Sequence, residues 1–243
     1  MQNNVKREDL ITELAEVINR IKLPHPVRVA IDGGGNAGKT TFADELRAGL
    51  ENLGRKVIRS TIDGFHNPPE IRRKQGKFSP KGYLEDSYNY PLLKKHLLDP
   101  LGPNGNLKYK DSIYNFKISK PTNAKFKTAS RDSILLFDGI FLFNEHLLSY
   151  WDYKLYIDAS FDNTMKRAII RDNELFGGTD NVIRLYEKRY IPGQEMYLSM
   201  YNPIKASDIV FNNNDYRNPI VTKISKNRLH NNLLHIRNSL KKH

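Results

Sequence analysis

Cysteine is absent from all 243 residues, which excludes disulfide bonds and thiolate metal sites. No apolar run approaches the length of a membrane span, and the N-terminal region carries acidic residues, unlike a signal or transit peptide. Acidic residues are also few, with 27 aspartates and glutamates against 39 lysines and arginines, a formal net charge of +12. We therefore expect a cytoplasmic protein without a membrane partner, whose charge suits nucleotides or nucleic acid.

The pattern G-x-x-x-x-G-K-[ST] occurs at residues 33–40. Glycines let the backbone N–H groups of residues 34–40 point at phosphate oxygens, Lys39 would bridge the β- and γ-phosphates, and Thr40 would bind Mg²⁺. The alternative, a chance glycine-rich turn, is disfavoured because residues 27–31 read as a buried strand and residues 41–46 open an amphipathic helix. We predict that ATP is bound by Gly33, Gly34, Gly35, Asn36, Ala37, Gly38, Lys39, Thr40 and Thr41.

Two further apolar segments end in a carboxylate. Residues 56–62 read as a strand followed by Asp63, and residues 133–137 read as a strand followed by Asp138, in the form of a Walker B motif. Because ligands bind outside the carboxyl ends of parallel strands, Asp63 is the candidate to orient and deprotonate an attacking hydroxyl. Asp138 would hold Mg²⁺ through a water. Taken alone, Asp63 and Gly64 could simply form a turn.

The remaining pattern predicts an α/β domain over residues 1–243, a parallel sheet flanked by helices. We expect helices at 6–22, 164–175, 182–200 and 219–243, strands at 153–158 and 208–211, and an irregular substrate-side insertion at 67–127 with a helical piece at 90–98. Within the insertion, 108–109 and 113–116 could pair as a hairpin that forms a flap. The basic cluster at 72–81 either solvates a loop or meets phosphates. Gly177 and Gly178 suggest a helical lid over 171–182.

Six segments taken in order, 33–40, 62–66, 135–142, 151–152, 171–172 and 189–194, resemble the uridine kinase and phosphoribulokinase family, and more narrowly bacterial uridine kinase-like proteins. The resemblance runs from about residue 27 to 219. It implies a nucleoside-kinase-like P-loop fold, ATP and Mg²⁺, and a small hydroxyl-bearing acceptor such as a nucleoside. It also implies catalytic roles for Lys39, Asp63 and Arg171 and acceptor or phosphate binding by Phe65, His66, Asp86, Tyr114 and Arg167.

The chain departs from the typical uridine kinase pattern at Asn115 and Ser119, where that pattern has Asp and His, and at the lid glycines, where it has arginines. Since a pyrimidine pocket must satisfy the polar edge of the base, the nucleobase stays open. Another small alcohol, such as pantothenate, nicotinamide riboside or a sugar phosphate, is an alternative acceptor. A nucleotide-dependent RNA-binding protein is a further alternative, disfavoured because the basic residues are scattered. The sequence also leaves a homo-oligomer open.

Overall fold

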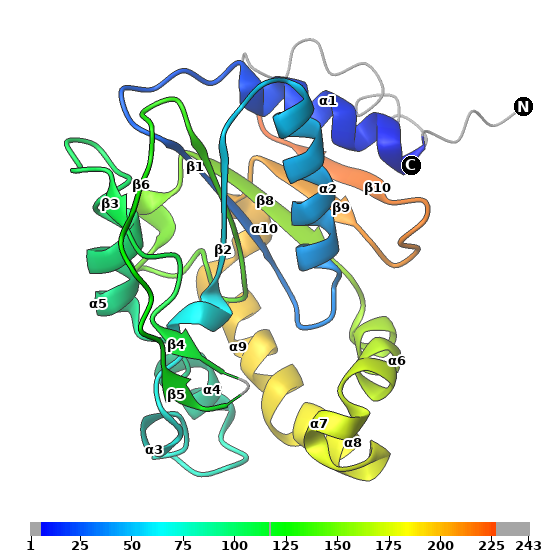
Figure 1. Cartoon of the computed structure of the whole chain (residues 1–243). Coiled ribbons are helices and arrows are strands. Elements are labelled where there is room, and N and C mark those ends of the chain that lie inside the picture. Colours follow the sequence, from blue (N-terminus) through cyan, green and yellow to red (C-terminus); the bar gives the residue numbers. More distant parts are fainter. Residues whose placement is uncertain (1–5, 117, 227–243) are drawn as a thin grey trace, which may run out of the picture.

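The computed structural model describes residues 6–116 and 118–226, which are built around a six-stranded sheet in the order β10-β9-β8-β1-β7-β2 (Figure 1). Five of the strands are parallel, and β10 alone runs antiparallel, against β9. This confirms the predicted α/β class. The strands are β1 (Val27–Gly33), β2 (Val57–Thr61), β7 (Ile134–Asp138), β8 (Tyr153–Asp158), β9 (Ile209–Asn212) and β10 (Ile220–Ile224).

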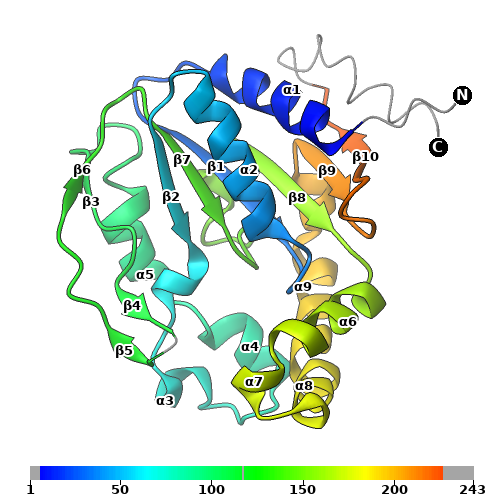
Figure 2. The same ribbon diagram turned by 45° about the vertical axis from the view of Figure 1, so that its right-hand side comes forward.

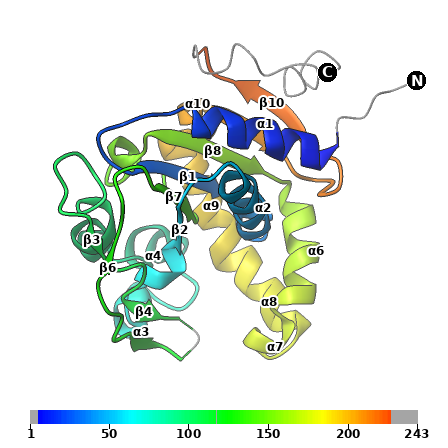
Figure 3. The same cartoon turned by 45° about the horizontal axis from the view of Figure 1, so that its top comes forward.

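Helices cover both faces of the sheet because its central strands are apolar on both sides. Alternate residues of β1 point to opposite faces: Val29 packs in the core under α1 (Arg7–Asn19) and α2 (Lys39–Asn52), and Ala30 packs in the core on the other side. That second core includes side chains of α5 (Tyr90–Leu93) and α9 (Ile191–Tyr201). Figure 3 shows α1 and α2 on one face and α9 on the other.

The elements beyond the carboxyl ends of the strands come from two parts of the chain. One part is the insertion and the other is the segment from α6 to α8, and Figure 2 shows them on opposite sides of the space below the sheet. On this side the insertion forms α3 (Pro69–Arg72), α4 (Pro80–Asp86), β4 (Tyr114–Asn115) and β5 (Lys120–Pro121), and the second segment forms α6 (Phe161–Arg171), α7 (Asn173–Phe176) and α8 (Thr179–Leu185). The pair β3 (Lys108–Tyr109) and β6 (Lys127–Thr128) lies beside the sheet near α5 in Figure 1, and α10 (Pro203–Ala206) follows α9.

The predicted hairpin is wrong. Strand β3 pairs with β6, and β4 pairs with β5. The residues between β3 and β4 cannot form a tight turn because they are tied to the end of β2: the Ser60 hydroxyl donates to the Asp111 carbonyl at 2.7 Å, and the Ile113 N–H donates to the Gly64 carbonyl at 2.9 Å.

The helix predicted from residue 219 is wrong over the residues described. Residues 220–224 form β10, and the part of that prediction from residue 227 on lies outside the described residues. A spacing of four between Ile220 and Ile224 satisfies a strand as well as a helix, since it keeps both side chains on one side of a pleated strand. Pairing with β9 decides for the strand, because β10 covers an edge of the sheet and buries Val221 in the core.

The single helix predicted at 164–175 is divided. Helix α6 ends at Arg171 and α7 begins at Asn173, with the buried Asp172 between them. A π-helical turn at 186–190 lies between α8 and α9. Among the helices of the described residues, none is both long and apolar enough to cross a membrane.

Helix α2 is fixed to the sheet by Phe42, whose ring lies 4.9 Å from that of Phe211 in β9, centroid to centroid. Phe42→Ala removes this fully buried ring, so we expect the free energy of unfolding to fall by about 3–5 kcal/mol. Chemical denaturation measures the change. Phe126→Ala is the matched control, because Phe126 is 59% exposed and its loss should change stability by less than about 0.5 kcal/mol. Equal effects of the two substitutions would contradict the packing described here.

Candidate active site

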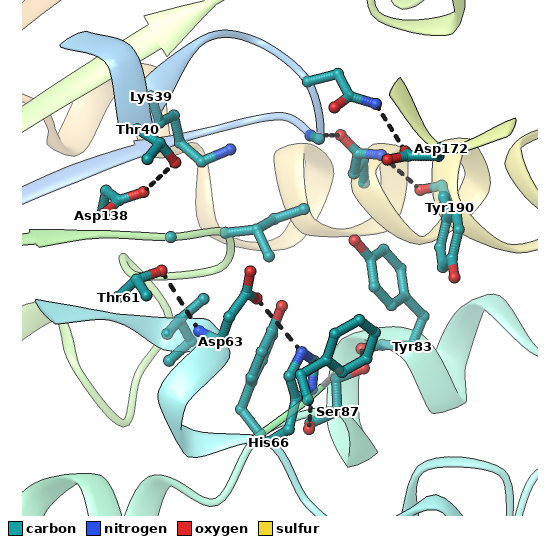
Figure 4. A pocket seen from close by; sticks show the side chains of 18 of the residues that line it. Lys39, Thr40, Thr61, Asp63, His66, Tyr83, Ser87, Asp138, Asp172 and Tyr190 are labelled. Atoms are coloured by element: carbon teal, nitrogen blue, oxygen red, sulfur yellow. Dashed lines mark hydrogen bonds and ion pairs between the residues drawn. The ribbon is translucent and has the colours of Figure 1, made fainter. Parts of the chain in front are cut away.

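A cavity of about 200 Å³ opens at the carboxyl edge of the sheet. Its wall is formed by the P-loop (residues 33–40), the 3₁₀ turn after β2 (Ile62–Phe65), the insertion and the end of β7. The segment from α6 to α8, the π-helical turn and α9 complete it. Figure 4 shows Lys39, Thr40 and Asp138 on one side of this space and Asp63 and His66 on the other. The cavity therefore brings together the predicted phosphate loop, the predicted base and the predicted metal ligand.

The sheet register explains this convergence. Asp138, the last residue of β7, is paired with Ile31 of β1 on one side and with Thr61 of β2 on the other. The P-loop begins two residues beyond Ile31, and Asp63 lies two residues beyond Thr61. Parallel pairing alone thus places the loop and the carboxylate on either side of Asp138 at one edge of the sheet.

Thr40 and Asp138 are in direct contact at the P-loop end of the cavity. The Thr40 hydroxyl donates to Asp138 Oδ2 at 2.8 Å, and Arg59 Nη1 donates to Asp138 Oδ1 at 3.0 Å. Within the described residues there is no cluster of three or more His, Asp or Glu side chains that could hold a metal by themselves. One hydroxyl and one carboxylate fit Mg²⁺, which keeps several waters and takes further oxygens from phosphates.

Lys39 lies beside a buried carboxylate at the base of the P-loop. Its ammonium donates to the Gly34 carbonyl at 2.6 Å. Burial lowers the pKa of Lys39, and the carboxylates of Asp32, Asp138 and Asp63 oppose that shift. Burial also raises the pKa of Asp32 to about 6, although the Tyr197 hydroxyl and the Gly33 N–H both donate to this carboxylate. The P-loop lysine is therefore surrounded by acidic groups.

Asp63 and His66 form a pair within the turn after β2. His66 Nε2 lies 3.3 Å from Asp63 Oδ1, and His66 Nδ1 lies 3.1 Å from the Ser87 carbonyl oxygen. Both partners are acceptors, so both hydrogen bonds form only when both ring nitrogens carry a proton. Partial desolvation inside the cavity raises the pKa of Asp63, but the hydrogen bond and charge of His66, with Lys39 and Arg171, outweigh this effect and hold the pKa below its ordinary value.

Stacking fixes the orientation of His66. Its ring lies between Tyr88 and Phe116, at centroid distances of 4.6 and 4.5 Å. The side chain of Asp63 is 63% exposed and open to the cavity, whereas that of His66 is only 9% exposed. His66 therefore positions Asp63 and also lines the cavity, while its predicted contact with the acceptor stays a prediction.

A second network joins the P-loop to the segment between α6 and α8. Asn36 Nδ2 donates to the Tyr186 hydroxyl at 2.6 Å and to Asp172 Oδ2 at 3.2 Å. Arg171 Nε donates to Asp172 Oδ1 at 2.7 Å, and its side chain is 67% exposed along the cavity. The predicted lid is therefore in contact with the P-loop, with Arg171 beside the reaction space; its opening stays a prediction.

The structure does not bring four of the predicted substrate-binding residues into the cavity. Phe65 is fully buried, with its ring 6.2 Å from that of Phe137 in the core. Asp86 is bound by Lys74 Nζ at 2.8 Å and by Gln75 Nε2 at 2.7 Å. Tyr114 is buried outside the cavity wall. Arg167 donates to the backbone carbonyls of Asn36, Asn213 and Asn214, so it supports the P-loop from outside.

The predicted ATP-binding residues are divided in the same way. Gly35, Asn36, Lys39 and Thr40 line the cavity. Gly33 and Gly34 line a smaller neighbouring cavity, and Ala37 is buried. Gly38 has a φ of 95° and packs so closely that a Cβ there would lie 2.6 Å from Asn213 Nδ2. Thr41 is an exposed residue of the first turn of α2 and is not part of the cavity wall.

Two side chains that support the loop had no predicted role. Gln194 Oε1 accepts from the Gly35 N–H at 2.8 Å, and Asn213 Nδ2 donates to the Ala37 carbonyl at 2.7 Å. One of the N–H groups expected to face phosphate is thus bound to α9. Gln194 falls in a segment that carries the resemblance, so its position in the motif was a signal, whereas Asn213 lies in a polar loop without one.

The sequence model of the phosphoribulokinase / uridine kinase family matches residues 28–215. The chain belongs to this family. The match extends from β1 to the loop after β9, so it includes the P-loop, Asp63, Asp138 and the segment between α6 and α8. Membership makes the protein a P-loop kinase, and family members of this kind use ATP with Mg²⁺.

Several relatives of the chain carry kinase names. A uridine kinase of Brevibacillus brevis is 27% identical over 200 residues, which cover 79% of this chain and 87% of the relative. A uridine kinase of Lactobacillus helveticus is 29% identical over 199 residues, which cover 78% of this chain and 87% of the relative. A pantothenate kinase of Corynebacterium diphtheriae is 27% identical over 168 residues, which cover 66% of this chain and 54% of the relative.

Solved structures share the fold. The structure of a "possible uridine kinase" from Bacillus stearothermophilus has a TM-score of 0.65 at 21% sequence identity, covering 83% of this chain and 97% of the other. A D-glycerate 3-kinase from Cryptococcus neoformans has a TM-score of 0.51 at 14% identity, with coverage of 77% and 85%. At these identities the likeness concerns the fold alone.

The pair of Asp63 and His66 is testable by titration. His66→Phe keeps a ring between Tyr88 and Phe116 but removes the donor and charge that lower the pKa of Asp63, so we expect this pKa to rise. NMR titration of the labelled Asp63 carboxyl carbon measures the shift. His146→Phe changes a half-exposed histidine on the surface and serves as the control. An Asp63 pKa that stays the same in His66→Phe would contradict the pairing.

Proposed function

We propose that the protein transfers the γ-phosphoryl group of ATP to the hydroxyl of a small alcohol bound at Asp63. One observation carries the proposal: the Asp63 carboxylate and the P-loop lysine face the same cavity from opposite sides. A carboxylate in this position can orient an alcohol or a water molecule as the nucleophile, so transfer to an alcohol has to be measured against hydrolysis.

In the proposed reaction the acceptor oxygen attacks the γ-phosphorus, and the bond from that phosphorus to the oxygen bridging to the β-phosphate breaks. The hydroxyl proton passes to the Asp63 carboxylate. The transition state of phosphoryl transfer is loose, so a carboxylate with a low pKa suffices if it orients the hydroxyl. Lys39 and Arg171 supply positive charge where negative charge develops.

Thr40 and Asp138 would hold Mg²⁺, Thr40 through its hydroxyl and Asp138 through a water. The ion would neutralise charge on the β- and γ-phosphates. Arg59 keeps the Asp138 carboxylate oriented toward Thr40. The hydrogen bond from Asn36 to Asp172 would couple the position of the lid to the conformation of the P-loop. A closed lid would exclude water from the reacting groups.

For the acceptor, the 5′-hydroxyl of a nucleoside such as uridine is supported by the names of the relatives in Brevibacillus brevis and Lactobacillus helveticus. The pantothenate kinase relative supports a different small alcohol. Tyr114 and Asp86, which the resemblance assigned to base and sugar, lie outside the cavity wall. The supported proposal is therefore alcohol phosphorylation, with the nucleoside as one candidate among small alcohols.

Asp63→Asn tests the base. An amide cannot take the hydroxyl proton, so we expect kcat for phosphoryl transfer to fall by about 10²–10⁴-fold while the KM for ATP stays within a factor of about three. Transfer of radiolabel from γ-labelled ATP to a panel of alcohols, with ADP release measured in parallel, gives both values. Asp162→Asn, an exposed aspartate in the first turn of α6, is the control. Near-normal turnover in Asp63→Asn would refute the assignment.

Asp138→Asn tests the metal site. Losing the carboxylate beside Thr40 should raise the Mg²⁺ concentration for half-maximal activity by about tenfold or more. A Mg²⁺ titration of ATP turnover measures this. Asp44→Asn is the control, because Asp44 binds the same Arg59 at 3.0 Å but lies outside the cavity wall. An unchanged Mg²⁺ requirement in Asp138→Asn, or an equal change in Asp44→Asn, would exclude Asp138 as the metal-binding carboxylate.

A further inference from the structure

A second cavity, of about 270 Å³, adjoins the active-site cavity. One wall comes from the insertion around α3 and the other from α7, α8 and the π-helical turn. The second cavity does not include Lys39, Thr40 or Asp138. The two cavities share six lining residues, which are Arg72, Phe116, Leu175, Phe176, Arg189 and Tyr190. A molecule that reaches from Asp63 into the second cavity therefore extends away from the P-loop, at the acceptor end of the site.

Five basic side chains line this second cavity, and no carboxylate does. We call them the cation group; they are Arg72, Arg73, Lys77, Arg184 and Arg189. Among the ion pairs of the described residues none involves a member of this group. Five like charges around one space repel one another and attract an anion.

Aromatic rings hold four members of the cation group in place of acidic partners. Arg72 lies over Phe116 at 5.0 Å, and Arg184 and Lys77 lie over Phe78 at 4.8 and 5.5 Å. Arg189 lies over Tyr83 at 5.6 Å. Stacking on a ring orients a cation without neutralising its charge, so the donors of Arg72, Lys77 and Arg184 remain available to an anion.

Two members of the cation group are partly withdrawn from water. Arg189 is 6% exposed and donates to the carbonyls of Arg72, Gly76, Lys77 and Ser79, so it fastens the insertion to the π-helical turn. Arg72 Nε is buried without a hydrogen-bond partner. Burial lowers the pKa of Arg189, and the charges of Arg72 and Arg73 lower it further. The buried Nε–H of Arg72 is therefore an unpaired donor, which is costly unless a ligand supplies an acceptor.

From these contacts we infer that the acceptor is an alcohol that already carries an anionic group, which the cation group binds while the hydroxyl lies at Asp63. The inference rests on the proposed function and names its substrate class. A phosphate monoester fits best, since it offers two charges and three oxygens to several forked guanidinium groups, and a carboxylate is the second source of the same charge. The reacting bond stays that of the hydroxyl, so the product gains a second, separate phosphate monoester.

Binding to the full-length protein in the presence of Mg²⁺ and a non-hydrolysable ATP analogue tests the inference. Ribose 5-phosphate is compared with ribose, and glycerol 3-phosphate and glycerate are compared with glycerol, by calorimetry at fixed ionic strength. We expect the anionic member of at least one pair to bind at least tenfold more tightly. Tighter binding of a phosphate ester than of glycerate would identify the bound group as a phosphate, and the reverse order would identify it as a carboxylate. Equal binding within every pair, or binding by neither member of any pair, overturns the inference.

Variants of the cation group test whether the preference for anionic alcohols comes from this second cavity. Arg73→Gln and Arg184→Gln each remove one charge from opposite walls, so each should weaken binding of the anionic member by about tenfold and leave the neutral member unchanged. Lys188→Gln is the matched control, since this exposed residue lies next to Arg189 in the chain but outside the cavity wall. An anion preference that survives in the Arg73→Gln/Arg184→Gln double variant also overturns the inference.

Turnover separates this inference from the proposed function. With ATP, ³¹P NMR should show a new phosphate monoester on the hydroxyl of the preferred anionic alcohol. Equal transfer to the neutral and anionic members refutes the cation group as a substrate site while the kinase proposal stands. Tight, arginine-dependent binding without transfer to any hydroxyl refutes the kinase proposal while the anion site stands. A diphosphate product would overturn the inference, because the anion would then occupy the reacting position.

Discussion

The parallel pairing of β7 between β1 and β2 is the constraint on which the site depends. Asp138 is in register with residues of both neighbours, so the chain leaving β1 as the P-loop and the chain leaving β2 toward Asp63 start at the same level of the sheet. The register of β7 is held by packing on both faces, because a shift of one residue would move Leu135 and Phe137 out of one core and Ile134 and Leu136 out of the other. The chemistry that we propose at this edge follows from that register.

Contacts at the carboxyl edge of the sheet link α9 and the predicted lid to the phosphate loop. Gln194 of α9 accepts from Gly35, and Asn36 donates to both Asp172 and Tyr186. These bonds reach two consecutive residues of the P-loop from two different helical segments. A change in the position of the lid therefore alters the partners of the very residues expected to face the nucleotide, which offers a physical route from lid closure to phosphate binding.

The P-loop, Asp63 and Asp138 could be located from the sequence because each is marked by residues that are adjacent in the chain. A strand, a glycine loop and a helix are contiguous at residues 27–46, and Asp63 and Asp138 each end an apolar segment. Contacts between distant segments were not predictable in this way: Phe65 faces the core, Asp86 is bound by Lys74, and 108–109 pairs with β6 instead of with its near neighbour. The spacing of Ile220 and Ile224 fits both a helix and a strand, and only the pairing of this segment with β9 decides for the strand. The basic residues at 72–81 were visible, but their meeting with Arg184 and Arg189 required the fold.

We propose that a triphosphate in the P-loop and a hydroxyl at Asp63 face each other across one cavity. A crystal structure with Mg²⁺, a non-hydrolysable ATP analogue and a bound acceptor tests this arrangement. We expect the terminal phosphorus to lie between Lys39 and Asp63, with the acceptor oxygen hydrogen-bonded to Asp63 and about 3–3.5 Å from that phosphorus. A triphosphate bound away from the P-loop, or an acceptor whose hydroxyl does not reach Asp63, would contradict it.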